Sequence, residues 1–158
     1  MTRRYAYSLG GSRAVDSAPL SKPKNTTILP SIQLDGTLRY TTFSGGTTVE
    51  RFKRYLETDL LPHLNGNSVL IMDHMKSHHA KAVRNLLDSS GVRYIYLPPY
   101  SPDLNPIEKL WSKVKSFLRK FKARTLDALP NAIQCAFQTV SPSDCSGWFH
   151  SCGYSPYF

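Results

Sequence analysis

The sequence predicts an α/β fold in which a mixed sheet is flanked by helices, and two observations support this. The first is the order of the hydrophobic patterns, which read as a hairpin followed by strand, helix, strand and helix. The second is composition: 158 residues with 41% hydrophobic and 11% aromatic side chains can form a buried core and argue against disorder. We therefore expect residues 1–158 to form one domain.

The hairpin is predicted in residues 26–43, which contain two β-rich runs joined by Asp35 and Gly36. This dipeptide is typical of a two-residue type I′ turn. Pro30 lacks a backbone N–H, so the first run is expected at a sheet edge or a bulge. A shorter strand candidate, Tyr5–Leu9, lies in the basic and weakly patterned N-terminal segment.

Two more strands and five helical segments follow the hairpin. The continuous apolar run that ends at Asp73 predicts a strand buried on both faces, and residues 92–99 predict another strand. Thr47 and Glu50 form a capping-box pattern at the start of the first helix. The helical segments are predicted at 47–64 (closed by Pro62), 79–91, 107–121, 126–140 and 143–150.

The clearest helix starts after a stiff, proline-rich approach. Asn105 at the N-cap, Pro106 at the first turn and Glu108 three residues after Asn105 match a capping box. Its apolar residues follow the 3,4 spacing of a buried helix face: Ile107, Leu110, Trp111, Val114, Phe117, Leu118 and Phe121. Glu108 can therefore serve as a helix cap or as a functional carboxylate.

Charge indicates a polyanionic partner. Twenty Lys and Arg against eleven Asp and Glu give a net charge of +9 and an isoelectric point near 9.6, which is typical of proteins that bind nucleic acid. A basic protein that binds nothing is the alternative. Three cysteines form no disulfide framework or zinc motif, and no apolar stretch is long enough to span a membrane. We expect a soluble, cytoplasmic protein.

Two acids are the main candidates for chemistry. Asp73 ends a predicted strand, and Glu108 follows the neighbouring strand, so both fall where ligand sites collect in α/β sheets. Paired carboxylates in a basic protein favour Mg²⁺ and phosphodiester chemistry. The alternative for Asp73 is an Asx turn or a helix N-cap, which its position fits equally well.

Histidines near Asp73 raise a second possibility. His74 and His78 are four residues apart and could face one metal ion on a helix. No third nitrogen or sulfur ligand stands at a zinc-like spacing, which argues against zinc.

The polar face of the Glu108 helix is strongly basic. It is either a solvated surface or, as we prefer, a wall of cations that contacts DNA phosphates beside the acidic pair. These residues are Lys109, Lys113, Lys115, Arg119, Lys120 and Lys122.

The segments "LIMDHMKSHHAKAVRNLL" and "YLPPYSPDLNPIEKLWSKVK" closely resemble the catalytic domain of DDE transposases of the mariner superfamily, in particular its bacterial insertion-sequence branch. The resemblance implies an RNase H-like fold in which three acids hold two Mg²⁺ ions, with Mn²⁺ as a substitute. Asp73 and His78 match the motif of the second acid, and Glu108 matches the third. Thirty-four residues separate Asp73 from Glu108, the interval typical of this family.

The sequence departs from the family pattern in two places. His74 stands where the family has Asn; the resemblance assigns His74, His78 and Asn105 supporting roles around the metal ligands. The family's first Asp lies on a first, central strand that precedes the segment matched here, and neither Asp16 nor Asp35 stands in its place. We therefore expect a fold without its first central strand and a chain that is inactive alone. Such a chain is either the downstream reading frame of a frameshifted transposase or a decayed remnant.

The expected function follows from this resemblance: metal-dependent DNA cleavage and strand transfer during DNA transposition. The expected partners are transposon-end and target DNA, the upstream transposase portion or a second copy of the chain, and the expected location is the bacterial cytoplasm, at the nucleoid when bound to DNA. A non-enzymatic DNA-binding or transposase-binding remnant is the alternative function.

Overall fold

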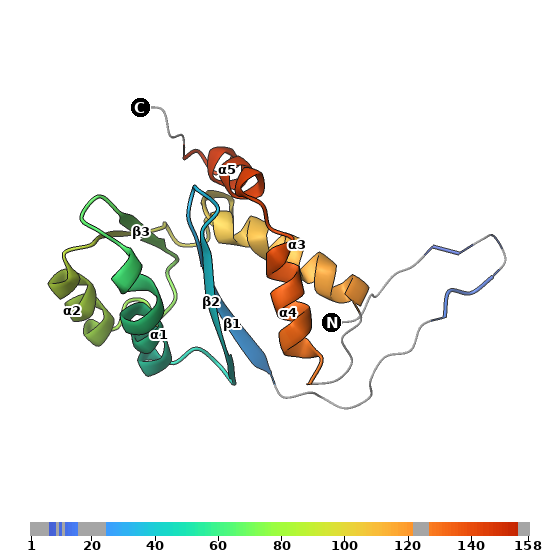
Figure 1. Cartoon of the computed structure of the whole chain (residues 1–158), viewed down its shortest axis with the longest axis horizontal. Helices are drawn as coiled ribbons and strands as arrows, with labels where there is room; N and C mark the ends of the chain where they lie inside the picture. Colours follow the sequence, from blue (N-terminus) through green and yellow to red (C-terminus); the bar gives the residue numbers. More distant parts are fainter. Residues whose placement is uncertain (1–6, 9, 11, 16–24, 122–126, 155–158) are drawn as a thin grey trace.

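The computed structural model describes residues 7–8, 10, 12–15, 25–121 and 127–154 (Figure 1). Its strands are β1 Thr26–Ile32, β2 Leu38–Ser44, β3 Val69–Met72 and β4 Arg93–Tyr96. Its α-helices are α1 Val49–Tyr55, α2 Lys81–Ser90, α3 Pro106–Phe121, α4 Leu129–Gln138 and α5 Pro142–Ser151. A π-helical turn at Leu56–Leu60 and 3₁₀ turns at Leu61–His63 and Pro102–Leu104 complete the list.

The strands form two separate two-stranded sheets within the described residues. β1 and β2 are an antiparallel hairpin, and β3 and β4 are a parallel pair. In Figure 1 the hairpin stands between α1, α2 and β3 on one side and α3 and α4 on the other. The predicted mixed α/β architecture is confirmed, but as two small sheets rather than one continuous sheet.

The hairpin turn differs from the prediction. Gln33 N–H donates to Thr37 O at 2.9 Å, and Gly36 N–H donates to Gln33 O at 3.1 Å. A type I′ turn needs positive φ at both central residues, but Gly36 is left-handed (φ 91°) and Asp35 is not. The turn is therefore a three-residue loop with glycine at its left-handed position. Asp35 Oδ1 accepts from Thr37 N–H at 2.8 Å and stabilises that loop.

Burial of β3 also differs from the prediction. Val69 is 44% exposed and only Met72 is fully buried, so the strand is not covered on both faces. The physical reason is that β4 is the only strand paired with β3 among the residues described. An apolar run indicates which residues a strand can bury, but it does not indicate which strands or helices cover them.

The helices largely match their predictions. The N-cap of α1 is Thr48 rather than Thr47, because the Thr48 side chain accepts from Arg51 N–H. Gly91 ends α2 in the left-handed conformation, as its position predicts. Leu126 and most of Tyr5–Leu9 lie outside the described residues, and Tyr7 and Ser8 adopt no strand conformation.

Two hydrophobic cores lie on either side of the hairpin. The α1–α2 core consists of Phe52, Tyr55, Leu56, Leu60, Met72, Val83 and Leu87. The α3–α4 core consists of Leu110, Val114, Leu118, Ala132, Ile133, Ala136 and Phe137. β1 contributes to both: Leu29 packs against the first core, and Ile28 and Ile32 pack against the second.

No helix in the described part of the chain is long and apolar enough to cross a membrane. Cys135, Cys145 and Cys152 are free thiols.

Candidate active site

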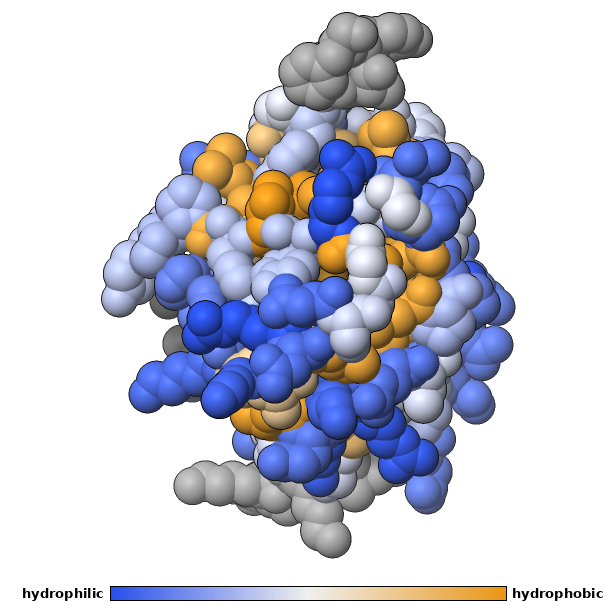
Figure 2. All heavy atoms as spheres, turned by 90° about the vertical axis from the view of Figure 1, so that its left-hand side faces the viewer, coloured by the Kyte–Doolittle hydropathy of each residue, from blue (hydrophilic) through white to orange (hydrophobic). Residues whose placement is uncertain are grey.

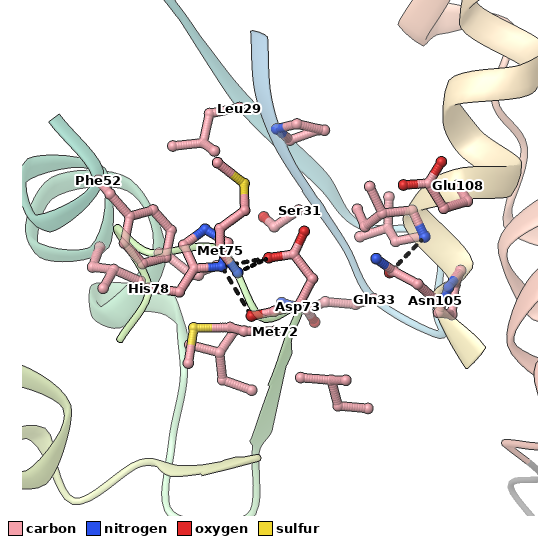
Figure 3. A pocket seen from close by; sticks show the side chains of 18 of the residues that line it. Leu29, Ser31, Gln33, Phe52, Met72, Asp73, Met75, His78, Asn105 and Glu108 are labelled. Atoms are coloured by element: carbon pink, nitrogen blue, oxygen red, sulfur yellow. Dashed lines mark hydrogen bonds and ion pairs between the residues drawn. The ribbon is translucent and has the colours of Figure 1, made fainter. Parts of the chain in front are cut away.

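Asp73 follows the last residue of β3 and is held by two hydrogen bonds (Figure 3). Its Oδ1 accepts from Met75 N–H at 3.1 Å and lies 2.8 Å from His78 Nδ1. The first contact is the Asx turn that the sequence allowed. The second engages a histidine that the family resemblance assigns to the site. The Asp73 carboxylate therefore both forms the Asx turn and contacts a histidine of the candidate site.

His78 is fixed by its surroundings. The residue is 7% exposed, and its ring lies 4.1 Å from the ring of Phe52, centroid to centroid. Nδ1 also lies 3.3 Å from Asp73 O, whereas Nε2 is buried with no hydrogen-bond partner among the described atoms. These contacts fit a ring that carries its proton on Nδ1 and donates it toward Asp73.

The pKa of Asp73 is lowered from its usual value. The largest cause is the hydrogen bond from His78; partial burial opposes the shift, and the Met75 N–H reinforces it. The carboxylate is therefore ionised over the whole neutral range, which is the form that a metal cation binds.

Glu108 is positioned by the start of α3. Asn105 Oδ1 accepts from Ile107 N–H at 3.2 Å, and Asn105 O accepts from Glu108 N–H at 3.0 Å. The full capping box is not formed, because Asn105 N–H donates to Pro102 O instead of to the Glu108 carboxylate. Glu108 is exposed, and its carboxylate takes part in no ion pair within the described residues.

The two carboxylates line one cavity of about 380 Å³. Asp73 reaches it from the end of β3 and Glu108 from the first turn of α3; Figure 3 shows Asp73 near the middle of the view and Glu108 to its right, beyond the ribbon of β1. Asn105, Met75 and His78 also line this cavity. Both predicted acids and two of the three predicted supporting residues therefore line the same cavity.

His74 points elsewhere. Its ring packs on the ring of His79, with centroids 4.0 Å apart, and His79 in turn stacks on Tyr96 at 3.9 Å. His74 does not line the cavity. Burial lowers the pKa of His79, and the neighbouring His74 adds to that shift. The segment between Asp73 and α2 is a set of turns, so His74 and His78 do not share a helical face.

The two carboxylates suit a hard divalent cation. Oxygen ligands are those that Mg²⁺ prefers, and Asp73 Oδ2 and the Glu108 carboxylate carry no hydrogen bond from a described residue. No group of three or more His, Cys, Asp or Glu side chains that could hold a metal ion occurs among the residues described.

The basic residues of α3 form two separate stripes. One residue of an α-helix turns it by about 100°, so Lys115 and Arg119, seven and eleven positions after Glu108, share its stripe. Lys109, Lys113 and Lys120 lie about a third of a turn away, along a shallow pocket beside α5. Lys122 lies outside the described residues.

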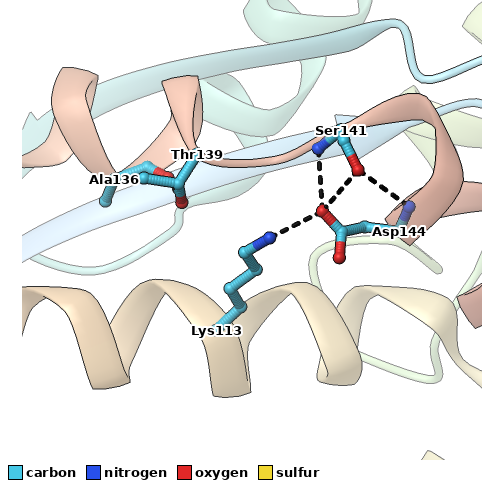
Figure 4. A network of polar contacts seen from close by, with 5 residues as sticks. All are labelled: Lys113, Ala136, Thr139, Ser141 and Asp144. Carbon is cyan, nitrogen blue, oxygen red and sulfur yellow. Dashed lines mark hydrogen bonds and ion pairs between the residues drawn. The ribbon is translucent and has the colours of Figure 1, made fainter.

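Lys113 is engaged by α5 (Figure 4). Its Nζ lies 2.6 Å from Asp144 Oδ2, which also accepts from Ser141 N–H at 2.8 Å in the capping box of α5. The Lys113 hydrogen bond, followed by the Ser141 contacts, lowers the pKa of Asp144 to about 2. Lys113 therefore fixes α5 to α3, and its predicted contact with DNA stays a prediction.

Sequence reasoning missed several residues that shape the site. Phe52 sets the ring of His78, and the Tyr96 hydroxyl donates to His78 O at 2.8 Å. Both residues belong to apolar patterns that indicate only a core. Asp144, thirty-one residues from Lys113, reads in the sequence as a helix cap and nothing more.

Comparison with known proteins identifies the family. The family model described as "DDE superfamily endonuclease" matches residues 1–130. This match covers most of the chain, which therefore belongs to the DDE superfamily of endonucleases.

Individual relatives agree with this family. The chain is 28% identical over 97 residues to the Tc1 transposable-element transposase of Caenorhabditis elegans, covering 59% of this chain and 36% of that protein. The Mos1 mariner paired-end complex with Mn has a TM-score of 0.75 at 20% identity, covering 99% of this chain and 52% of that one. The catalytic domain of Mos1 mariner transposase has a TM-score of 0.68 at 20% identity, covering 82% and 70%.

These likenesses confirm the RNase H-like fold class and the similarity to transposase catalytic domains. The chain spans about a third of the Tc1 transposase and about half of the Mos1 chain in the complex with Mn.

Proposed function

We propose that this chain is the catalytic part of a bacterial insertion-sequence transposase that cuts DNA at the ends of its element and joins them to target DNA. The observation that carries the proposal is the convergence of Asp73 and Glu108 on one cavity in a DDE superfamily chain. We assign both as ligands of Mg²⁺, with Mn²⁺ as a substitute. A bound divalent ion supplies charge stabilisation for the attacking and leaving oxygens of a phosphodiester.

Two neighbouring residues of this chain position the two carboxylates. His78 holds the Asp73 carboxylate in one orientation and keeps it ionised, and Asn105 fixes the first turn of α3 from which Glu108 projects. Lys115 and Arg119, on the Glu108 stripe, are placed to contact the phosphates of a DNA strand entering the cavity.

The family resemblance implies a third carboxylate, and residues 25–121 and 127–154 hold no group of three such ligands. We propose that it is supplied by an upstream portion of the transposase, read from a second frame, and that two copies assemble on transposon-end DNA in the cytoplasm. On this proposal the chain alone does not cut DNA.

The test is metal-dependent nicking of a duplex that carries the element's end. We expect no nicking by the chain alone, and nicking with Mg²⁺ or Mn²⁺ when the upstream portion is fused to it. In the fusion, Asp73→Asn or Glu108→Gln should reduce nicking to background, whereas Glu57→Gln, a matched change at an exposed helix position, should not. Activity retained by the Asp73 or Glu108 variants contradicts the proposal.

The stripe on α3 supports a second candidate function, DNA binding without chemistry. It predicts salt-sensitive binding of DNA that Asp73→Asn leaves unchanged. Lys115→Gln with Arg119→Gln should lower the slope of log affinity against log salt by about two, at roughly 0.9 per phosphate contact. A nicking-competent fusion that loses activity in the carboxylate variants rules out this candidate as the sole function.

A further inference from the structure

Aromatic rings form a continuous stack between the turns that follow β3 and the strand β4. The rings of His74 and His79 have centroids 4.0 Å apart, and the ring of His79 stacks on that of Tyr96 at 3.9 Å. The ring of Tyr94 meets Tyr96 edge to face, with centroids 5.7 Å apart. The Tyr96 hydroxyl donates to His78 O at 2.8 Å, and this bond fixes the inner end of the stack.

The outer end of this stack is open to solvent, because His74 is an exposed residue. Rings that pack on one another are held in place, so a flat ligand that stacks on the outer ring orders little that was mobile before. His74 does not line the cavity that Asp73 and Glu108 share. The ring stack is therefore a second surface beside the candidate active site.

Hydrogen-bond donors that suit a phosphate lie next to the ring stack. His79 directly precedes Ala80, the N-cap of α2, and no side chain caps this helix. The backbone N–H groups of Lys81 and Ala82, in the first turn, have no partner among the described residues. Free N–H groups and the helix dipole both attract negative charge, so this helix start favours an anion.

Cationic side chains accompany the same helix start. Arg84 Nε donates to His79 O at 3.0 Å, which holds the guanidinium beside the ring stack. Lys76, in the turns before α2, and Lys81, its first residue, are exposed and take part in no ion pair within the described part of the chain. Figure 2 shows strongly hydrophilic side chains beside an apolar patch on the face toward which α2 lies. Aromatic rings combined with cations are typical of surfaces that bind single-stranded nucleic acid.

We propose that this surface binds one unpaired nucleotide of a DNA strand, with its base stacked on His74 and its phosphate at the start of α2. The proposal rests on the proposed function: His74 directly follows Asp73, so the bound nucleotide lies beside the phosphodiester that reaches the carboxylates. Paired bases in a duplex hide their faces, so only a base that is unpaired or turned out of the duplex can stack on the ring. The site therefore favours DNA that is opened next to the carboxylates.

The test is DNA binding in EDTA, which needs no metal and is separate from the nicking assay. Two short duplexes are compared by fluorescence anisotropy: one carries a single unpaired adenine, and the other carries an abasic residue at the same place. We expect the chain to bind the first about tenfold more tightly, the effect typical of one base stacked on an aromatic ring. If the fusion nicks DNA but this preference is absent, only the present inference fails.

Substitutions separate the ring from its charge. His74→Ala and His74→Lys should abolish the preference for the unpaired adenine, because neither leaves a ring, whereas His74→Phe should retain it. Lys81→Gln should weaken binding of both duplexes equally, because both carry the phosphate. His63→Ala, a matched change at an exposed histidine outside the stack, should leave the preference intact.

Three results overturn the proposal. The first is equal binding of the two duplexes by the unmodified chain, and the second is a preference that persists in His74→Ala. The third is competition by free deoxyadenosine monophosphate that is as strong as competition by the DNA, because the site then takes a free nucleotide instead of a DNA strand.

Discussion

The two carboxylates of the cavity are positioned in opposite ways. Asp73 is partly buried and is held by hydrogen bonds from a side chain and a backbone amide, which also lower its pKa. Glu108 is exposed, and its place is set by the backbone at the start of α3, with no bond to its carboxylate from the described residues. Each also adjoins a different core: Asp73 follows a strand that packs in the α1–α2 core, and Glu108 lies in the first turn of the main helix of the α3–α4 core.

This difference means that the site has two independent supports. Damage to the α1–α2 core should disturb Asp73 and its histidine, and damage to the α3–α4 core should disturb Glu108. The hairpin connects them, through Leu29 and the Tyr55 hydroxyl on one side and Ile28 and Ile32 on the other. Perturbing each side separately therefore tests whether the halves behave as two units.

The largest effect is expected from truncating the centre of each core. Leu87 and Leu110 are both 0% exposed, so Leu87→Ala and Leu110→Ala should each cost about 2–5 kcal/mol of unfolding free energy. Trp111 and Trp148 both pack against the α3–α4 core, so tryptophan fluorescence reports that half. In urea titrations we expect Leu110→Ala to shift the fluorescence transition more than Leu87→Ala does.

Circular dichroism supplies the control, because both halves contain helices. Leu87→Ala should shift an early part of the dichroism transition that fluorescence does not follow. Equal shifts of both signals in both variants would show that the chain unfolds as one unit and would remove the distinction between the two supports.

A smaller effect is expected from removing the partner of Asp73. His78→Gln should raise the pKa of Asp73 toward its usual value, because the His78 hydrogen bond is the main cause of the lowering. Mn²⁺ affinity should fall about 10–100-fold, as is typical when a residue that orients a metal ligand is lost. Carboxyl-resolved NMR titration and a Mn²⁺ binding isotherm measure the two effects.

The lowered pKa of Asp73 also determines how folding stability changes with pH. A carboxyl whose pKa is lower in the folded state adds stability above its unfolded pKa, about 3.9, and loses it as the pH falls through the folded value. His78→Gln should therefore reduce the loss of stability in acid. An unchanged Asp73 pKa in this variant contradicts the assigned hydrogen bond.

Removing the support of Glu108 should change the stability of α3 but not the pKa of Asp73. Asn105→Ala removes the side-chain cap of α3 and should cost about 0.5–2 kcal/mol without changing the pKa of Asp73. Asn105→Ser, which restores a capping oxygen, should recover most of that loss in thermal unfolding. A change in the Asp73 titration caused by Asn105→Ala would show that the two supports are coupled.

The smallest effect is expected at the contact between α3 and α5. Asp144→Asn weakens a partly exposed ion pair and should cost about 1 kcal/mol or less at neutral pH. Because the folded pKa of Asp144 is about 2, the wild type should lose this contribution as the pH falls from about 4 toward 2. Thermal unfolding of wild type and variant should therefore converge in that range.

The sequence predicted the elements whose signals are local. The spacing of apolar residues in α3 and the glycine after α2 define helix positions because both depend on neighbours a few residues away. The Asp35-Gly36 dipeptide predicted a turn but not its type, since the same residues fit a two-residue or a three-residue loop. The apolar run of β3 could not show that, among the residues described, β4 is its only paired strand.

The candidate site was predicted in part for the same reason. Asp73 and Glu108 follow strands, and strand ends can be recognised from sequence. Which histidine turns toward Asp73 depends on the turns before α2 and on Phe52, so His78 and His74 could not be separated by spacing. The Lys113–Asp144 pair joins two helices distant in sequence, which no local pattern records.

Metal-directed cleavage of the protein tests most directly whether the two carboxylates serve one metal site. Fe²⁺ is added in place of Mg²⁺ with ascorbate and peroxide, and backbone cuts produced by hydroxyl radicals are mapped by mass spectrometry. We expect cuts next to Asp73 and next to Glu108, with both sets lost in Asp73→Asn and also in Glu108→Gln. If each substitution removes only the cuts beside itself, or neither removes any, the two carboxylates do not share a metal site.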